Sequence, residues 1–455
     1  MSTFVGYSRR KYSRLLCLDV GSTWTKGALV SHSGELLGTA QHPTTTAEVL
    51  DGIAEVTAAL DATSAEVLMC SSAGGGLRLA VVGQERLISA EAGYRAALSA
   101  GAKVVHVAAG RLDTAAVQAL RASTPDILLL TGGTDGGDED VVLHNANRLA
   151  RARIGLPIVL AANAVAAPRA MASLLATGRT ATLAANVLPD VGELAPGPAR
   201  DAIRAMFLKH VIGGKGLSRG RKFRRLVRSV TPDAVLSGVA ALADVLGARG
   251  SAGAVLVVDV GGATTDVYSS VPGTQQEEIR AVGLAADRRT VEGDLGMRFS
   301  AREVIEEAFA EGLIAVAQRP RLRQEAAYRA RHIDFAPTDE EQRTVDGEIA
   351  RLAAVLAVRR HLRLVEGRLG PRGAGLLVLS GGVFRHAGPD VLAATEKVLR
   401  ADPLLRPVLR DAAVAVDLHY VLAPAGLLAA AGREPAAHTL LATDPDLCPT
   451  PSEFP

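Results

Sequence analysis

Short apolar runs separated by small-residue turns open the chain. The pattern predicts strands over residues 15–20, 27–31, 35–40 and 66–70, and a helix over residues 46–60. Ser33-Gly34 is typical of a tight turn between the second and third of these strands. The chain is therefore expected to begin as a β-meander followed by a helix and a further strand.

The hydrophobic pattern changes at about residue 89, where short apolar runs begin to alternate with helical patterns. The expected strands cover residues 104–108, 127–130, 158–161 and 182–186, and the expected helices cover residues 89–100, 114–122, 138–151, 165–175 and 198–210. Alternation of this kind predicts a parallel α/β unit.

The opening pattern then returns in the second half. A helix over residues 232–246 leads into a small-residue stretch at 247–253, which is the expected main boundary. The pattern after it predicts strands over residues 255–260, 265–270, 277–282, 376–380 and 413–420, and helices over 345–369 and 424–431. Thr338 and Glu341 form a capping box that predicts the start of the long helix.

These patterns predict an α/β protein of two lobes. Residues 1–88 are expected to form the first part of one lobe, and 89–230 an α/β insertion and the rest of that lobe. Residues 231–252 are expected to be a connecting helix and linker, 253–433 a second lobe, and 434–455 a flexible tail rich in Pro, Ala and Thr.

One motif ends the first strand of each half. The two copies are Asp19-Val20-Gly21-Ser22-Thr23 and Asp259-Val260-Gly261-Gly262-Ala263-Thr264. A turn that binds phosphate needs outward backbone N–H groups and no obstructing Cβ, which glycine and small hydroxyl residues provide. A carboxylate beside phosphate is repulsive unless it holds a cation, so Asp19 and Asp259 are candidate Mg²⁺ ligands. The alternative is that both carboxylates only cap their turns, which the repetition makes less favoured.

The two copies differ in the strand that follows the turn. Lys26 and Asp266 occupy the same place in their copies. Lys26 could reach a phosphate as a point charge, and Asp266 could orient water or a metal. Asp266 and Asp19 are the candidate catalytic residues. Gly381-Gly382, between an apolar run and a helical pattern, would let a nucleoside approach the backbone, although a plain tight turn has the same pattern.

Composition narrows the class of protein. The chain has 455 residues, a formal net charge of +2 and three scattered cysteines. The length predicts more than one core, and the charge gives no reason to expect a nucleic-acid partner. The cysteines do not suggest a disulfide framework and suit the cytoplasm. We expect no membrane attachment, because charged residues, Pro and Gly interrupt the apolar stretches. An oligomer is possible.

The order of the three motifs resembles that of the superfamily of actin, sugar kinases and heat-shock ATPases. The resemblance implies two ribonuclease-H-like lobes, with an α/β insertion in the first lobe, that hold ATP and Mg²⁺ between them. It places these residues at the nucleotide: Gly21, Ser22, Thr23, Lys26, Gly261, Gly262, Thr264, Gly381 and Gly382. Arg385 stands where heat-shock relatives stack an arginine on adenine.

Three segments, at residues 70–77, 130–137 and 290–298, are similar to the glutamate mutase accessory protein family called MutL or GlmL. Membership implies an accessory chaperone that uses ATP to release damaged cobalamin from a cobalamin-dependent mutase, whose subunits are its partners. Two alternatives stay open. A small-molecule kinase of the same fold would use Asp266 or Asp294 as its base, and a scaffold protein would hold nucleotide only for stability.

Three further segments have both a functional and a purely structural interpretation. The loop at 131–137 could bind an anion or a partner's acidic group, or it could be a tight crossover. Glu292 and Asp294 could contact the metal, or they could belong to a capped helix entry. The basic stretch 215–228 could dock an acidic mutase subunit, or it could be a solvated helix face.

Overall fold

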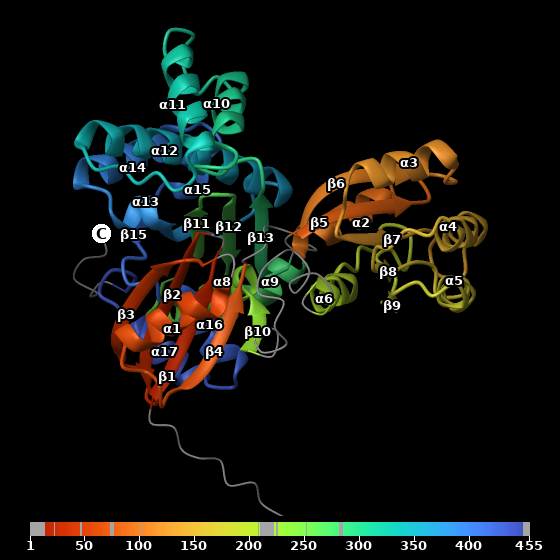
Figure 1. The fold of residues 1–455 in the computed structure, drawn as a ribbon, viewed down its shortest axis with the longest axis horizontal. Coiled ribbons are helices and arrows are strands. Elements are labelled where there is room, and N and C mark those ends of the chain that lie inside the picture. The colour runs from red at the N-terminus through yellow and green to blue at the C-terminus, as the bar shows by residue number, and fades with distance from the viewer. Residues whose placement is uncertain are drawn as a thin grey trace, which may run out of the picture.

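Three five-stranded sheets form the framework of the protein (Figure 1). The computed structural model describes residues 14–21, 23–45, 48–72, 77–100, 102–207, 209, 223, 226–251, 253–281 and 285–448. The basic stretch falls almost wholly outside these residues, as does Ser22.

The first sheet has the strand order β10-β4-β1-β2-β3. Its strands are β1 (Arg14–Val20), β2 (Trp24–Ser31), β3 (Leu36–Pro43), β4 (Glu66–Ser71) and β10 (Val227–Val230), and helix α1 (Val49–Ala59) packs on it. Strand β1 runs antiparallel to β2 and parallel to β4, so the expected β-meander is present.

The second sheet repeats this order as β13-β12-β11-β14-β15. Its strands are β11 (Ala254–Val260), β12 (Thr265–Ser270), β13 (Asp287–Glu292), β14 (Ala374–Ser380) and β15 (Ala413–Val416). In each sheet three antiparallel strands are followed by two parallel ones. The two sheets are the ribonuclease-H-like lobes that the sequence predicted, and that prediction is confirmed.

The third strand of the second lobe lies elsewhere than expected. Residues 277–281 of the predicted strand 277–282 belong to helix α9 (Gln276–Ala281), which is preceded by a short 3₁₀ turn, η2 (Gly273–Gln275). Their Gln-Glu-Glu start favours a helix over a strand. The true third strand, β13, contains four charged residues, which hide its β-pattern.

The third sheet is parallel throughout and has the order β6-β5-β7-β8-β9. Its strands are β5 (Leu77–Gly83), β6 (Ala102–Ala109), β7 (Ile127–Leu130), β8 (Ile158–Leu160) and β9 (Ala181–Leu183). This inserted sheet lies in the chain between β4 and β10, and it begins with β5, before the boundary at residue 89 that we expected. In Figure 1 it stands beside the two lobes as a separate layer.

Helices cover both faces of the inserted sheet. They are α2 (Ser89–Ser99) and α6 (Gly197–Met206) on one face, and α3 (Thr114–Ala122), α4 (Asp140–Arg151) and α5 (Ala167–Ala176) on the other. The second lobe carries α10 (Ala301–Ala310), α11 (Arg319–Arg331), α12 (Glu340–Leu364), α13 (Gly382–Arg385), α14 (Pro389–Ala401) and α15 (Arg406–Leu409). Asp339, rather than Thr338, caps α12 by accepting from the Gln342 N–H.

The expected flexible tail is ordered over most of its length. Residues 434–442 form helix α17 (Glu434–Ala442), whose buried face includes Ala437, Leu440 and Leu441. Leu447 and Cys448 join the same core. The expectation was therefore wrong for residues 434–448. The other predicted domain boundaries stay predictions.

Two helices cross between the lobes at very short range. They are α8 (Thr231–Ala248) and α16 (Leu422–Ala430). A Cβ added at Gly238 would collide with the Leu422 carbonyl oxygen, and one added at Gly426 would collide with the Ala234 carbonyl oxygen. Helix α8 is long and apolar enough to cross a membrane, but most of it is buried inside the protein. Its apolar character is accounted for by this packing.

The crossing predicts that Gly426→Ala is strongly destabilising. Overpacking of a tight contact costs about 1–3 kcal/mol, and here the obstacle is backbone, so the helices must separate. We expect the thermal midpoint to fall by several degrees. Gly197→Ala is the matched control, because a Cβ there meets nothing within 4 Å. Equal midpoints for the two variants would show that the crossing is not a close constraint.

Candidate functional site

The two Asp-Val-Gly turns have the same local geometry. The Gly21 N–H donates to the Trp24 carbonyl oxygen at 2.9 Å, and the Gly261 N–H donates to the Thr264 carbonyl oxygen at 2.9 Å. Within each hairpin Asp19 pairs with Lys26, and Asp259 pairs with Asp266. Lys26 and Asp266 therefore occupy equivalent positions, as the sequence predicted.

The two turns lie against each other across the lobes. A Cβ at Gly262 in the second turn would stand 3.4 Å from Thr23 Cγ2 in the first. The segment that follows β13 holds the second turn by backbone hydrogen bonds. There the Met297 N–H donates to the Gly261 carbonyl oxygen at 3.0 Å, and the Arg298 N–H donates to the Gly262 carbonyl oxygen at 2.8 Å.

The Gly381-Gly382 pair reaches the same place. Gly381 has a φ of 111° and packs its backbone against the Val260 carbonyl oxygen, so a side chain there is excluded by both conformation and space. A Cβ at Gly382 would meet nothing within 4 Å. Helix α13 begins at Gly382. All three sequence motifs are thus brought together, and the backbone at Gly382 is approachable.

Asp19 is held by two hydroxyl groups from distant parts of the chain. The Tyr420 hydroxyl donates to Asp19 Oδ2, and the Thr231 hydroxyl donates to Asp19 Oδ1. Tyr420 has a φ of 54°, in the left-handed region that costs a non-glycine residue about 1–2 kcal/mol. Sequence reasoning missed both residues. Nothing local marks them, except that Thr231 begins a helix.

The Tyr420 ring contacts two cationic side chains. Lys26 Nζ stands 3.7 Å from the ring centroid, and the Arg385 guanidinium carbon stands 4.8 Å from it. Arg385 Nε also donates to the Asp417 carbonyl oxygen at 3.3 Å. Burial lowers the pKa of Lys26, and the nearby charges of Asp19 and Asp259 oppose that shift. Arg385 is thus directed at Tyr420 and Asp417.

Three carboxyl groups of this site have raised pKa values. Burial, and then the charge of Asp259, raises the pKa of Asp266 to about 7. Burial also raises the pKa of Asp259, against the opposing charges of Lys26 and Arg385. Asp417, a residue that the sequence analysis did not single out, has its pKa raised by burial to about 6. It follows a parallel strand end, which is the signal that could have identified it.

Two buried carboxylate oxygens in this group, Asp266 Oδ1 and Asp417 Oδ2, have no hydrogen-bond partner among the described residues. Carboxylate oxygens are the ligands that Mg²⁺ prefers. A divalent cation therefore fits the donor set.

Glu292 and Asp294 are both engaged by Arg360, and Glu292 ends β13 opposite Thr265, the residue that follows the second turn. Arg360 of α12 donates to Glu292 Oε2 at 2.7 Å and to Asp294 Oδ2 at 2.9 Å. These ion pairs with Arg360 give both acidic residues a structural role. Asp294 is therefore a poorer candidate base than Asp266.

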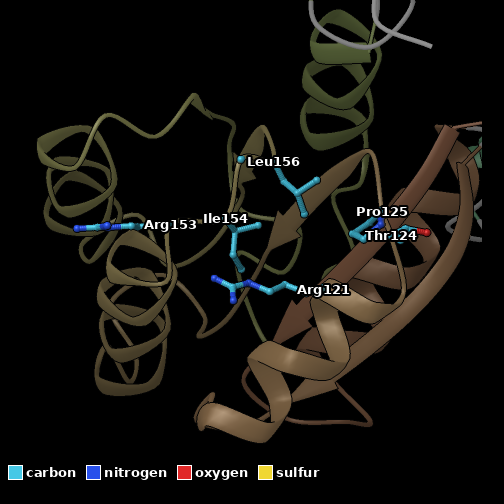
Figure 2. Close-up of a pocket in the computed structure, with 7 residues that line it drawn as sticks. Arg121, Thr124, Pro125, Arg153, Ile154 and Leu156 are labelled. Carbon is cyan, nitrogen blue, oxygen red and sulfur yellow. The ribbon is translucent and has the colours of Figure 1, made fainter. Parts of the chain in front are cut away.

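A surface pocket elsewhere contains none of the predicted site residues. Figure 2 shows it in the inserted unit, lined by residues that include Arg121, Pro125 and Ile154. These residues precede strands β7 and β8, so the pocket lies at the amino edge of the inserted sheet. Ligands of open α/β sheets bind at the opposite, carboxyl edge.

The fold defines a two-lobed protein of the actin-like class. The family described as "MutL protein" matches residues 15–444. The chain is 34% identical over 442 residues to "Protein MutL" of Clostridium tetanomorphum, covering 91% of this chain and 95% of that protein. The chain therefore belongs to the MutL protein family, and the family resemblance noted in the sequence is confirmed.

Similarity to solved structures is weak. A nucleotide-free acetone carboxylase matches with a TM-score of 0.37 and 12% identity, covering 91% of this chain and 70% of that one. Component A of the (R)-2-hydroxyglutaryl-CoA dehydratase of Acidaminococcus fermentans matches with a TM-score of 0.30 and 12% identity, covering 94% and 96%. Likeness at this level carries no weight for what this chain binds.

The raised pKa of Asp266 predicts a pH-dependent stability in the absence of ligands. An unfolded Asp loses its proton near pH 4, whereas folded Asp266 keeps its proton up to about pH 7. Because the folded state binds more protons in this window, stability falls as pH rises, by about 1.4 kcal/mol per pH unit for this group.

Asp266→Asn should make the fall between about pH 4 and pH 7 shallower, as measured by urea unfolding at several pH values. Part of the fall should remain, because the pKa values of Asp259 and Asp417 are also raised. An unchanged slope would mean that Asp266 ionises normally.

The contact between Tyr420 and Asp19 predicts the effect of removing one hydroxyl. Tyr420→Phe keeps the ring beside its two cations but leaves buried Asp19 one donor short, which costs about 1–3 kcal/mol. We expect a lower thermal midpoint without ligand. Tyr328→Phe is the control, since that ring is 40% exposed. If both variants unfold at the wild-type temperature, the hydroxyl contributes nothing to stability.

Proposed function

We propose that this chain is an ATP-hydrolysing accessory chaperone that reactivates a cobalamin-dependent mutase of the glutamate mutase kind. In this proposal it drives the exchange of damaged cobalamin for intact cofactor. The observation that carries the proposal is the pair of matching Asp-Val-Gly turns that meet across two lobes, with Asp19, Asp259 and Asp266 beside them. Membership of the MutL protein family supports the accessory role.

Each site residue has a role in this proposal. Residues in the two turns, with Lys26, would hold the phosphates: Gly21, Ser22, Thr23, Gly261, Gly262 and Thr264. Gly381 and Gly382 would leave room for adenosine, with Arg385 beside it. Bound ATP would supply the phosphoanhydride bond, and Mg²⁺ held by Asp19 and Asp259 would neutralise phosphate charge.

Asp266 is the group best suited to orient a water molecule. Its pKa of about 7 makes it able to gain or lose a proton at neutral pH. One of its oxygens has no partner among the described residues, and the other lies 3.5 Å from the Thr264 hydroxyl. A buried carboxyl with one free oxygen can accept a hydrogen bond from water. We assign the hydrolytic role to Asp266 and a supporting role to Asp19.

Asp19 links nucleotide binding to the arrangement of the lobes. Both of its oxygens accept from hydroxyl groups, Thr231 at the start of α8 and Tyr420 just before α16. A cation bound by Asp19 would share these oxygens with the two hydroxyl groups. The helices that carry the hydroxyls cross at Gly238 and Gly426, so a change at Asp19 acts on the connection between the lobes.

Two measurements test the proposal. Purified protein should hydrolyse ATP without a small-molecule phosphate acceptor, and with ATP it should restore turnover to a glutamate mutase that holds inactivated cobalamin. Asp266→Ala should reduce both activities by at least 100-fold. Exposed Glu55→Gln, on α1, is the control.

The outcomes separate the candidate functions. ATP consumption that requires an added small substrate would indicate a kinase. Nucleotide binding without any turnover would indicate a scaffold. A mutase that stays inactive although free cobalamin can exchange would overturn reactivation.

A further inference from the structure

The carboxyl edge of the inserted sheet is built as a single surface. All its strands are parallel, so the loops that follow β5, β7, β8 and β9 emerge at the same edge. The loop after β7 is the glycine-rich segment at residues 131–137. The strand order is β6-β5-β7-β8-β9, so the chain adds β6 on one side of β5 and β7, β8 and β9 on the other. Ligands of such sheets bind at this switch point, between β5 and β7.

Side chains from the neighbouring loops hold this glycine-rich loop in place. Gln84 Nε2, after β5, donates to Asp138 Oδ2 at 2.7 Å. Asn163 Nδ2, after β8, donates to the Gly137 carbonyl oxygen at 3.0 Å, and Asn186 Nδ2, after β9, donates to the Gly133 carbonyl oxygen at 2.9 Å. The four loops therefore form one hydrogen-bonded frame.

Large apolar side chains stand exposed on this frame. Leu87 and Val191 are 86% and 84% exposed, which makes them the two most exposed large apolar side chains among the described residues. Ile88, Val165 and Leu194 in the same loops are also exposed. These five residues, which we call the edge patch, stand on a frame that side-chain hydrogen bonds hold in place. Apolar side chains exposed along one ordered edge of a sheet are typical of an interaction site.

The charge around the edge patch is mainly negative. Glu85, Asp138, Asp190 and Glu193 are all exposed in these loops, against one exposed arginine there, Arg86. The nearby Arg111 and Arg169 lie within ion-pair distance of Asp140 and Glu139. The rim of the edge patch is therefore acidic and favours a partner surface that carries Lys and Arg.

Two other kinds of occupant fit less well. An anion at the glycine-rich loop would meet these carboxylates, and two loop amides are already used: Asp135 N–H donates to the Pro189 carbonyl oxygen and Gly136 N–H donates to Asn163 Oδ1. A small ligand between β5 and β7 would meet Gln84, because a Cβ built at Gly132 would stand only 3.2 Å from Gln84 Cβ. The edge patch therefore suits a protein partner better than an anion or a small ligand.

The edge patch is also connected to the second lobe. Helix α2 begins directly after Ile88 and is followed by Ala100, whose carbonyl oxygen accepts from Arg289 Nη2 at 2.7 Å. Arg289 belongs to β13 and also bonds Asp233 of α8 at 2.9 Å. One helix thus joins the exposed edge to both the second lobe and the inter-lobe helix.

We propose that the edge patch is the docking surface for a mutase subunit, and that the subunit presents an apolar centre surrounded by Lys and Arg. The inference rests on the proposed function for the identity of the partner. Helix α2 gives the docked subunit a direct mechanical connection to the lobes.

The test measures binding of purified glutamate mutase to the full chain by biolayer interferometry. Leu87→Asp combined with Val191→Asp should weaken binding by at least 10-fold, because it places charge at the centre of the interface. Val316→Asp is the matched control, since Val316 is 76% exposed but lies in the second lobe. Thermal midpoints check that each variant is folded.

A second variant tests the charge of the rim. Asp190→Lys combined with Glu193→Lys should weaken binding several-fold, and the effect should shrink at high salt as the charges are screened. This variant keeps the apolar centre intact and so remains informative if the first one misfolds.

The outcomes are distinct. If mutase binds wild type and all variants equally, the docking surface is wrong while the proposed function stands. If mutase does not bind wild type with or without ATP, both fail. If the edge-patch variants instead convert a dimer to a monomer by light scattering, the occupant is a second copy of this chain and the proposal is overturned.

Discussion

The close crossing of α8 and α16 is the constraint on which the site depends. Glycine at Gly238 and Gly426 lets the two backbones touch, so the helices act as one element between the lobes. Each helix starts beside the candidate site. Thr231 is the first residue of α8, and Tyr420 precedes α16, and both bond Asp19. The crossing therefore fixes the distance between the two hydroxyls that hold this carboxylate.

The same crossing explains why a strained tyrosine is tolerated. Tyr420 adopts a left-handed backbone conformation, which persists only where its surroundings fix it. Its hydroxyl is bound by Asp19, and its ring is covered by Lys26 on one side. The cation neutralises part of the acidic cluster, and the tyrosine shields the cation from water. A divalent cation bound by Asp19 would share the oxygens of this carboxylate with the Tyr420 hydroxyl.

Local signals in the sequence predicted the parts of the fold that are encoded locally. The doubled turn was recognisable because Asp-Val-Gly follows an apolar run in both copies, and strands such as Ile127–Leu130 and Thr265–Ser270 have uninterrupted β-patterns. Helix α17 was missed, since its Ala-rich sequence becomes ordered only by packing into the core beside α8. Strand β13 was missed because its charged residues find their partners in other segments of the chain.

The site itself was only partly predictable for the same reason. Its aspartates and glycines lie in recognisable turns, but the groups that hold Asp19 are separated from it by 212 and 401 positions. No window of sequence contains both members of such a pair. Asp417 had a weak local signal, because it follows the parallel strand β15, whose last residue pairs with Leu379. What the sequence lacks is the packing that brings these segments together.

Arg289 links the second lobe to the inserted unit and to α8. By chain order the inserted sheet belongs to the first lobe, yet buried Arg289 of the second lobe bonds the carbonyl oxygen of Ala100 and the carboxylate of Asp233. A buried guanidinium that loses its partners is costly. The second lobe therefore cannot move far from α8 without moving α2 or breaking these bonds. Any closure that changes the angle between the lobes must act on the insertion, and a partner held by the insertion must in turn act on the lobes.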